Sequence, residues 1–148
     1  MKSQALQNFA RAWTSMATVL IVDDEYGIAE LLEAVLVDEG HRVLTSSNGK
    51  HALSVLEAEK PDIIFLDYMM PVMDGASMLS RMAQDPVLRT IPVVLMSSIP
   101  EATVQERCRG YALFLRKPFD VFNVIDIVKR FTVPGERRLL IDSSTDGN

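Results

Sequence analysis

The chain has 148 residues, of which 48% are hydrophobic and 24% charged, a composition typical of one globular domain. A formal net charge of −5, with no run of Lys or Arg, argues against a protein that binds nucleic acid. No apolar run is long enough to cross a membrane or to form the core of a signal peptide, and the single cysteine, Cys108, allows no internal disulfide, so we expect a cytoplasmic protein without membrane attachment.

The N-terminal residues carry a short apolar stripe. Four side chains repeat there at the spacing of one helix face: Leu6, Phe9, Ala10 and Trp13. Such a helix can dock on a partner or pair with a second copy to form a homodimer, and it can equally be a leader that packs loosely. We expect an N-terminal extension over residues 1–17, a folded domain over 18–132 and a mostly polar tail over 133–148.

Five short runs rich in apolar and β-branched residues predict strands. They span residues 18–22, 42–46, 63–67, 92–96 and 112–116. The third run begins with Ile63-Ile64-Phe65-Leu66 and ends at a single carboxylate, Asp67. A carboxylate at the end of a buried strand is costly unless something uses it.

Residues at helical spacing follow each predicted strand. The first helix is expected to end at Gly40, the second to begin at Asn48 and the fifth to begin at Asp120. The fourth is a polar stretch over about residues 101–109, which Gly110 ends. Strands that alternate with helices predict an α/β fold, a doubly wound parallel sheet with helices on both faces.

Polar side chains stand at the carboxyl ends of four of the five predicted strands. Asp23 and Asp24 follow the first strand, Asp67 ends the third, Ser97 follows the fourth and Lys117 follows the fifth. The second strand ends in nothing distinctive. Each group alone has a structural explanation, such as an Asp that caps the next loop. Because the carboxyl ends of parallel strands share one edge of the sheet, their joint placement predicts a site there.

The chemistry of that site follows from its groups. Carboxylates that lie close together repel one another, so a cation is expected between them. Oxygen ligands without a His or Cys cluster favour Mg²⁺ or Mn²⁺. Lys117 supplies a charge suited to phosphate, and the Ser97 hydroxyl can donate to a phosphoryl oxygen. Asp67 can act as the nucleophile that becomes an aspartyl-phosphate.

Four motifs together resemble the receiver domain of two-component response regulators, the CheY-like family. They are Leu20-Ile21-Val22-Asp23-Asp24-Glu25, Leu66-Asp67-Tyr68-Met69-Met70-Pro71-Val72-Met73-Asp74-Gly75, Met96-Ser97-Ser98 and Lys117-Pro118-Phe119. The resemblance extends over nearly the whole of residues 18–132 and is specific only when the four are taken together. It implies a flavodoxin-like (βα)5 sheet with the strand order 2-1-3-4-5.

The resemblance also implies how the acidic residues act. Asp67 would accept a phosphoryl group from a phosphohistidine on a histidine kinase or histidine phosphotransfer protein. Asp24 would bind the cation directly and Asp23 largely through water. The backbone carbonyl of Met69 would be a further metal ligand.

The same resemblance implies a switch. Lys117 would pair with the phosphoryl group, its bond to Pro118 would be cis, and Ser97 would move toward the phosphate. Phe114 stands at the family's aromatic switch position without the hydroxyl of a Tyr. The face built from the fourth helix, fifth strand and fifth helix would then change shape for an unknown downstream protein.

Two features depart from the family pattern. Between Ser97 and Gly110 the chain is shorter than is usual in the family. The fourth helix, and with it the output face, is therefore expected to depart from the family pattern. Both ends carry extensions that the pattern does not explain. Because residues 18–132 leave no room for an output domain, we expect a single-domain regulator, free-standing or excised from a longer protein. It would catalyse only its own phosphorylation and dephosphorylation.

Two apolar residues beside the predicted phosphorylation site bear on the lifetime of the phosphoryl group. Met69 and Ile99 stand two residues after Asp67 and Ser97. Both side chains are apolar and should hinder an attacking water, so a long-lived phosphoryl-aspartate is expected.

Other classes of function stay open from the sequence. A Mg²⁺-dependent aspartyl-phosphate phosphohydrolase would usually place a second carboxylate where this chain has Met69. A flavodoxin-like cofactor binder would need a loop rich in Ser, Thr and Gly in place of Asp23-Asp24-Glu25. A receiver that is never phosphorylated and serves only as an interaction module is a further alternative.

Overall fold

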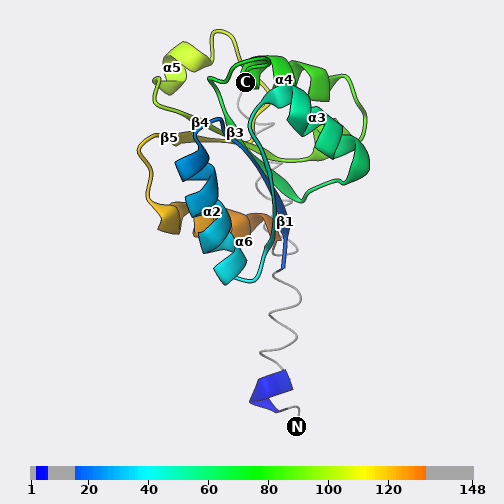
Figure 1. Cartoon of the computed structure of the whole chain (residues 1–148), viewed down its shortest axis with the longest axis vertical. Coiled ribbons are helices and arrows are strands. Elements are labelled where there is room, and N and C mark those ends of the chain that lie inside the picture. Colours follow the sequence, from blue (N-terminus) through cyan, green and yellow to red (C-terminus); the bar gives the residue numbers. More distant parts are fainter. Residues whose placement is uncertain (1–2, 7–15, 133–148) are drawn as a thin grey trace.

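The computed structural model describes residues 3–6 and 16–132, which contain one sheet of five parallel strands (Figure 1). The strands are β1 (Thr18–Val22), β2 (Arg42–Ser46), β3 (Ile63–Asp67), β4 (Val93–Ser97) and β5 (Leu113–Arg116). Their order is β2-β1-β3-β4-β5, which confirms the expected topology. Both β4 and β5 begin one residue later than the sequence predicted, and β4 extends to Ser97.

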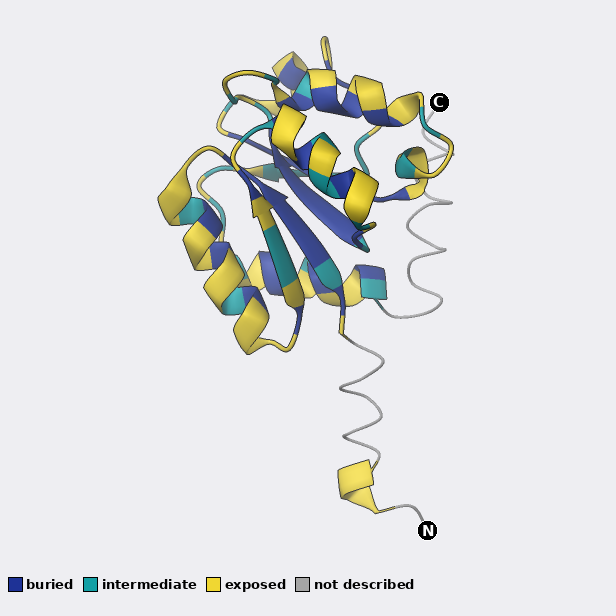
Figure 2. Cartoon of the chain, turned by 45° about the vertical axis from the view of Figure 1, so that its right-hand side comes forward, coloured by how far each residue is buried: buried dark blue, intermediate teal, exposed yellow. Residues whose placement is uncertain are grey.

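Helices cover both faces of the sheet. They are α2 (Tyr26–Asp38), α3 (Gly49–Ala58), α4 (Gly75–Ala83), α5 (Glu101–Val104) and α6 (Val121–Thr132), with a 3-10 turn η1 (Leu88–Thr90) before β4. One buried cluster joins α2 and α6 to the sheet, and a second joins α3, α4 and α5 to it. Figure 2 shows the strands mostly buried and the outer side of each helix exposed, the pattern of an amphipathic helix on a sheet.

The predicted helix boundaries rest on specific contacts. The Asn48 side chain accepts a hydrogen bond from the His51 N–H at 2.8 Å and caps α3. The Asp120 carboxylate accepts from the Phe122 N–H at 2.9 Å where α6 begins. Gly40, with φ of +91°, ends the segment after α2 in a conformation that favours glycine. These three predictions are confirmed.

The fourth predicted helix is much shorter than expected. The sequence predicted a helix over about residues 101–109, whereas α5 ends at Val104 and is followed by turns. Two residues of this segment, Val104 and Cys108, are buried, and the others over residues 101–110 are exposed. Two buried side chains one helical turn apart are too few to stabilise a long helix against the sheet, because helices in proteins are stabilised mainly by a packed apolar face.

The ordered packing begins just before β1. Ala17 is buried, and its N–H donates to Nδ1 of His41 at 3.1 Å, so Ala17 is held beside the start of β2. In the N-terminal stripe Leu6 is exposed, while Phe9, Ala10 and Trp13 lie outside the described residues, as does the tail over 133–148. No helix in the described part of the chain has the length and hydropathy to cross a membrane.

Candidate functional site

Two buried carboxylates meet at the carboxyl edge of the sheet. Asp23 follows β1 and Asp67 ends β3, and these strands are neighbours with Val22 paired to Leu66. The two side chains belong to residues that are only 2% and 5% exposed. Parallel pairing thus brings together two acids that are far apart in the sequence, as predicted.

Lys117 joins the acids from the end of β5. Its Nζ lies 2.9 Å from Asp23 Oδ2, 3.5 Å from Asp67 Oδ1 and 3.7 Å from Glu25 Oε1. Burial alone would lower the pKa of Lys117, but the hydrogen bond and charge of Asp23 outweigh it and the pKa is raised. The ammonium is therefore held in its charged form inside the cleft. The Lys117–Pro118 bond is cis, as expected.

The Asp67 carboxyl is hard to ionise in this setting. Burial, and then the negative charge of Asp23, raise its pKa to about 7, although the Lys117 ammonium lowers it. The charge of Asp24 raises the pKa as well, so Asp24 lies within electrostatic reach of Asp67. A further positive charge would favour the ionised, nucleophilic form.

A divalent cation fits the donor atoms of the cleft. One carboxylate oxygen each from Asp23, Glu25 and Asp67 lie within 4.8 Å of one another. Clustered hard oxygens without nitrogen or sulfur donors suit Mg²⁺ or Mn²⁺. Glu25 was not among the predicted ligands, although it is the third acid of the run that the sequence singled out.

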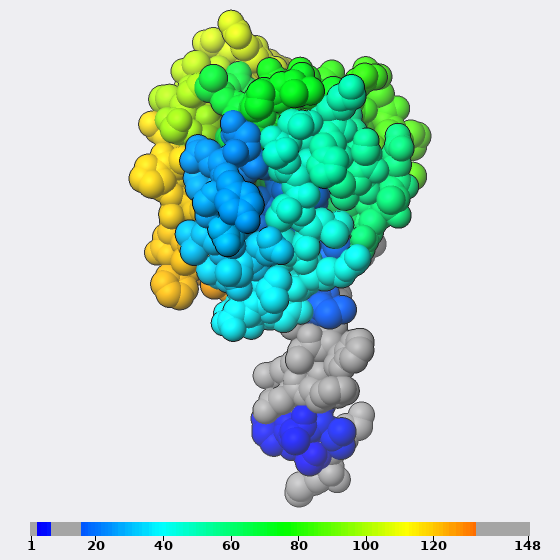
Figure 3. Space-filling model, viewed as in Figure 1, coloured from blue at the N-terminus to red at the C-terminus, as the bar shows by residue number. Residues whose placement is uncertain are grey.

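Asp24, a predicted ligand, is exposed and lies toward a neighbouring recess. This cavity of about 270 Å³ runs between the start of α2 and the loop after β2, on the face drawn in Figure 3. Ser46, Ser47 and His51 also line it. The metal-ligand role of Asp24 stays a prediction.

The end of β2, which looked undistinguished in sequence, carries a polar network. Ser46 is buried, its hydroxyl donates to the Asn48 carbonyl at 2.9 Å, and its Oγ lies 2.8 Å from Nδ1 of His51. Ser46 ends β2 as Ser97 ends β4, so a hydroxyl at the end of a predicted strand is the sequence signal for this network.

Ser97 and Phe114 occupy the strands beyond β3. Ser97 is 2% exposed, and its Oγ accepts a hydrogen bond from the Ile99 N–H at 3.0 Å. Phe114 is partly buried on β5, with its ring centroid 6.2 Å from that of Tyr111. Asp67 pairs with Met96 of β4, so Ser97 lies one residue beyond the position next to Asp67. Phe114 lies one strand further from Asp67, on β5, where it pairs with Leu95.

The loop after Asp67 is tightly held. Gly75 donates its N–H to the Tyr68 carbonyl at 3.0 Å, and a Cβ on Gly75 would lie 2.6 Å from the Asp67 carbonyl oxygen. Only glycine allows this approach, which returns the chain to the edge of the sheet at the start of α4. Val72 in the same loop has φ of +67°, an unusual value for a β-branched residue.

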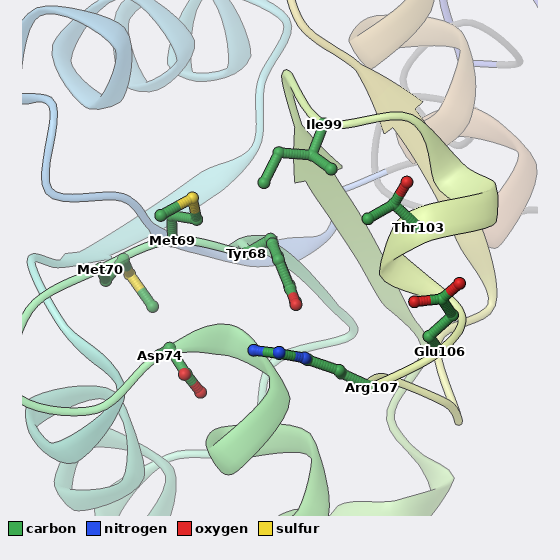
Figure 4. Close-up of a pocket in the computed structure, with 8 residues that line it drawn as sticks. All are labelled: Tyr68, Met69, Met70, Asp74, Ile99, Thr103, Glu106 and Arg107. Atoms are coloured by element: carbon green, nitrogen blue, oxygen red, sulfur yellow. The ribbon is translucent and has the colours of Figure 1, made fainter.

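A second cavity adjoins the site on the side of α5. It holds about 360 Å³ and is lined by Tyr68, Met69, Met70, Asp74, Ile99, Thr103, Glu106 and Arg107 (Figure 4). In Figure 4 the apolar side chains of Met69 and Ile99 lie along one rim, and the Arg107 side chain extends across the cavity toward Asp74. Met69 and Ile99 thus flank the space next to the predicted phosphorylation site.

Residues 19–129 match the family model of the response regulator receiver domain. The chain therefore belongs to the response regulator receiver family and is a receiver of two-component phosphorelay signalling. Receivers of this family interact with histidine kinases or phosphotransfer proteins and bind Mg²⁺ at an acidic pocket.

Among curated relatives, the chain is similar to sporulation initiation phosphotransferase F of Bacillus subtilis. The two are 36% identical over 115 residues, which is 76% of this chain and 91% of that protein. It is also 41% identical over 106 residues to the response regulator PleD of Caulobacter vibrioides, of which it spans 23%.

Two solved receiver structures resemble this fold closely. One is the receiver domain of a signal transduction histidine kinase from Syntrophus aciditrophicus, with a TM-score of 0.72, 34% identity and coverage of 78% of this chain and 89% of that one. The other is the receiver domain of the sensor histidine kinase PA1611 from Pseudomonas aeruginosa, which has a magnesium ion coordinated in its active site cleft. Its TM-score is 0.73 at 26% identity, covering 78% of this chain and 97% of that one.

Proposed function

We propose that Asp67 accepts a phosphoryl group from a phosphohistidine on a histidine kinase or histidine phosphotransfer protein, in the cytoplasm. Mg²⁺, or Mn²⁺ in its place, would be held by Asp67, Asp23, Asp24 and the backbone carbonyl of Met69. The observation that carries this proposal is the buried Asp67 carboxylate with the Lys117 ammonium 3.5 Å away at the edge of the sheet.

The transfer exchanges one bond for another. An Asp67 carboxylate oxygen forms a bond to phosphorus as the bond from phosphorus to the donor's imidazole nitrogen breaks, and the imidazole leaves with the electron pair. Lys117 neutralises charge on the phosphoryl oxygens from inside the cleft. A bound divalent cation would supply further positive charge to those oxygens and to Asp67.

Ser97 is poised to respond to the new phosphoryl group. Its Oγ accepts a hydrogen bond from Ile99, while its own proton is donated to none of the described residues. That proton is free to reach a phosphoryl oxygen, which would draw Ser97 and the loop after it toward Asp67. Phe114 on the adjacent strand would then repack, and the face formed by α5, β5 and α6 would change shape for a downstream protein.

A surface groove supports a protein as the phosphoryl donor. It holds about 390 Å³ between α2 and the start of α6. Apolar side chains dominate its lining, which consists of Ile28, Leu31, Leu32, Pro118, Phe119 and Val121, together with Glu25, Ser98 and Lys117. An apolar groove that ends at Lys117 in the cleft suits a folded partner that brings its histidine to Asp67.

The test is phosphorylation by acetyl phosphate and Mg²⁺, measured by intact mass. We expect wild-type protein and the control Asp38→Asn to gain one phosphoryl group and Asp67→Asn to gain none. Asp38 is an exposed acid at the end of α2, so it controls for the loss of one carboxylate. A phosphoryl group retained by Asp67→Asn would contradict the assignment of the acceptor. If wild type gains none, a beryllofluoride titration separates rapid hydrolysis from a receiver that serves only as an interaction module.

A further inference from the structure

Tyr111, two residues before β5, joins the predicted switch residue Phe114 to the short helix α5. Its hydroxyl donates to Glu101 Oε1 at 3.1 Å, and its ring centroid lies 6.2 Å from that of Phe114. We propose that Tyr111 is a positioning residue, a clasp that holds α5 beside β5 until Asp67 is phosphorylated. The inference rests on the proposed function, because it concerns how the same receiver site is switched.

The Tyr111 hydroxyl is bound by two side chains of α5. Glu101 begins the helix and accepts the hydroxyl proton, and the side chain of Gln105, the C-cap residue, makes a second hydrogen bond to the hydroxyl. Residues four apart lie on one face of a helix, so the hydroxyl spans the length of α5. Burial, together with the hydrogen bond and charge of Glu101, raises the pKa of Tyr111 against the opposing effect of Gln105. The hydroxyl therefore keeps the proton that it donates.

Little else fixes α5 in the part of the chain that the structure describes. Val104 is the one buried residue within the helix, and the N-cap residue, Pro100, makes no side-chain hydrogen bond. The cavity of about 360 Å³ lies between this segment and the loop after β3 (Figure 4). α5 therefore has room to move toward Asp67, whereas the Tyr111 clasp ties it to the start of β5.

The order of the strands gives the direction of the movement that breaks the clasp. β4 lies between β3 and β5, so Ser97 moves away from β5 when a phosphoryl group on Asp67 draws it toward β3. Residues 98–100 alone separate Ser97 from the first residue of α5, so the same movement pulls the acceptor away from the Tyr111 hydroxyl. Breaking this hydrogen bond opposes the switch, and its loss frees the Tyr111 ring to turn together with Phe114.

The experiment is a titration of the full chain with beryllofluoride and Mg²⁺, followed by ¹H–¹⁵N NMR, in which beryllofluoride takes the place of the phosphoryl group on Asp67. Tyr111→Phe removes the hydroxyl and keeps the ring. We expect it to bind beryllofluoride about threefold more tightly than wild type, because the switch no longer breaks a hydrogen bond. Glu101→Met removes the acceptor and should act in the same direction. Glu33→Met, which removes an exposed acid from α2, should leave the affinity unchanged.

Two further readouts separate a clasp from a hydrogen bond that is merely structural. The double variant should bind beryllofluoride no more tightly than Tyr111→Phe, because both substitutions remove one interaction. Tyr111→Phe should also lower the urea midpoint of the free protein and leave the midpoint in saturating beryllofluoride and Mg²⁺ unchanged. Equal losses of stability in both conditions, with the affinity of wild type, would overturn the proposal. Gains in affinity that add in the double variant would overturn it as well.

Wild-type protein separates this failure from that of the proposed function. If wild type neither gains a phosphoryl group from acetyl phosphate nor binds beryllofluoride, the proposed function fails and the Tyr111 clasp fails with it. If wild type does both and Tyr111→Phe binds beryllofluoride no more tightly, only the clasp is rejected.

Discussion

Strands β3 and β5 belong to the same sheet but are held very differently. Every residue of β3 is buried, whereas the residues of β5 are partly buried or exposed. β3 lies between β1 and β4, while β5 lies at the edge beside the four-residue helix α5. The predicted phosphoacceptor therefore stands on a fixed strand, and the predicted switch residue stands on one whose rearrangement loses less buried surface.

The largest expected effect tests this contrast with two matched substitutions. Phe65→Ala on β3 removes a fully buried ring and should lower the free energy of unfolding by about 3–5 kcal/mol. Phe114→Ala on β5 removes a partly buried ring and should cost only about 1–2 kcal/mol. Urea unfolding of both variants measures the difference. Equal losses would mean that β5 is as firmly packed as β3.

The next prediction concerns the loops that follow β3 and its neighbour β4. Met69 follows β3, Ile99 follows β4, and both line a cavity together with Tyr68, the residue after Asp67. Replacing either apolar side chain, by Met69→Asn or Ile99→Asp, should admit and orient water and speed phosphoryl hydrolysis about tenfold, which corresponds to about 1.4 kcal/mol. Loss of the labelled mass over time gives the rate. Val87→Asn, at an exposed position on another loop, is the control, and an unchanged rate in both test variants would reject the shielding role.

A smaller effect should come from strain in the loop that follows β3. Val72→Gly relieves a positive φ of 67° at an exposed position and should stabilise the fold by about 1 kcal/mol. Val87→Gly is the matched control, because Val87 is also exposed but has φ of −85°. That control should lose stability through the greater freedom of the unfolded chain. Thermal unfolding of the two variants in parallel decides the matter, and equal destabilisation would show that Val72 is unstrained.

The smallest effect is expected at the opposite edge of the sheet, away from the acids. Burial lowers the pKa of His41, and the charge of Lys129 acts in the same direction against an opposing effect of Glu39. The neutral ring accepts the Ala17 N–H, so folding favours the unprotonated form. The neutral His41 ring therefore contributes to the free energy of unfolding. This contribution is complete above the ordinary pKa of 6.5 and is lost as the pH falls through the lower pKa of the folded state.

The pH dependence can be assigned with two variants. His41→Gln should flatten the decline of unfolding free energy on acidification, while His51→Gln, which removes the other imidazole, should leave that contribution in place. Denaturant unfolding at a series of pH values provides the curves. A decline as steep in His41→Gln as in wild type would assign the acid sensitivity to other groups.

The sequence alone determined the strands and most of the cleft. Runs such as Ile63–Asp67 are apolar enough to be buried wherever the sheet forms, so their bounds can be read from local composition. Because the carboxyl ends of parallel strands share an edge of the sheet, the sequence also predicts that Asp23, Asp67 and Lys117 lie together. Their contacts in the structure agree with that placement.

Tertiary structure alone decided the length of α5, the direction of the third acid and the network at the end of β2. A polar stretch has helical propensity over residues 101–109, but only packing fixes how far the helix continues, and here Val104 is the one buried residue within α5. The run Asp23-Asp24-Glu25 contains three similar acids, and the turn at the end of β1 determines that Glu25 faces the cleft while Asp24 faces the neighbouring recess. The length of α5 depends on packing against segments distant in the sequence, and the directions of Asp24 and Glu25 depend on the conformation of one turn; local composition encodes neither.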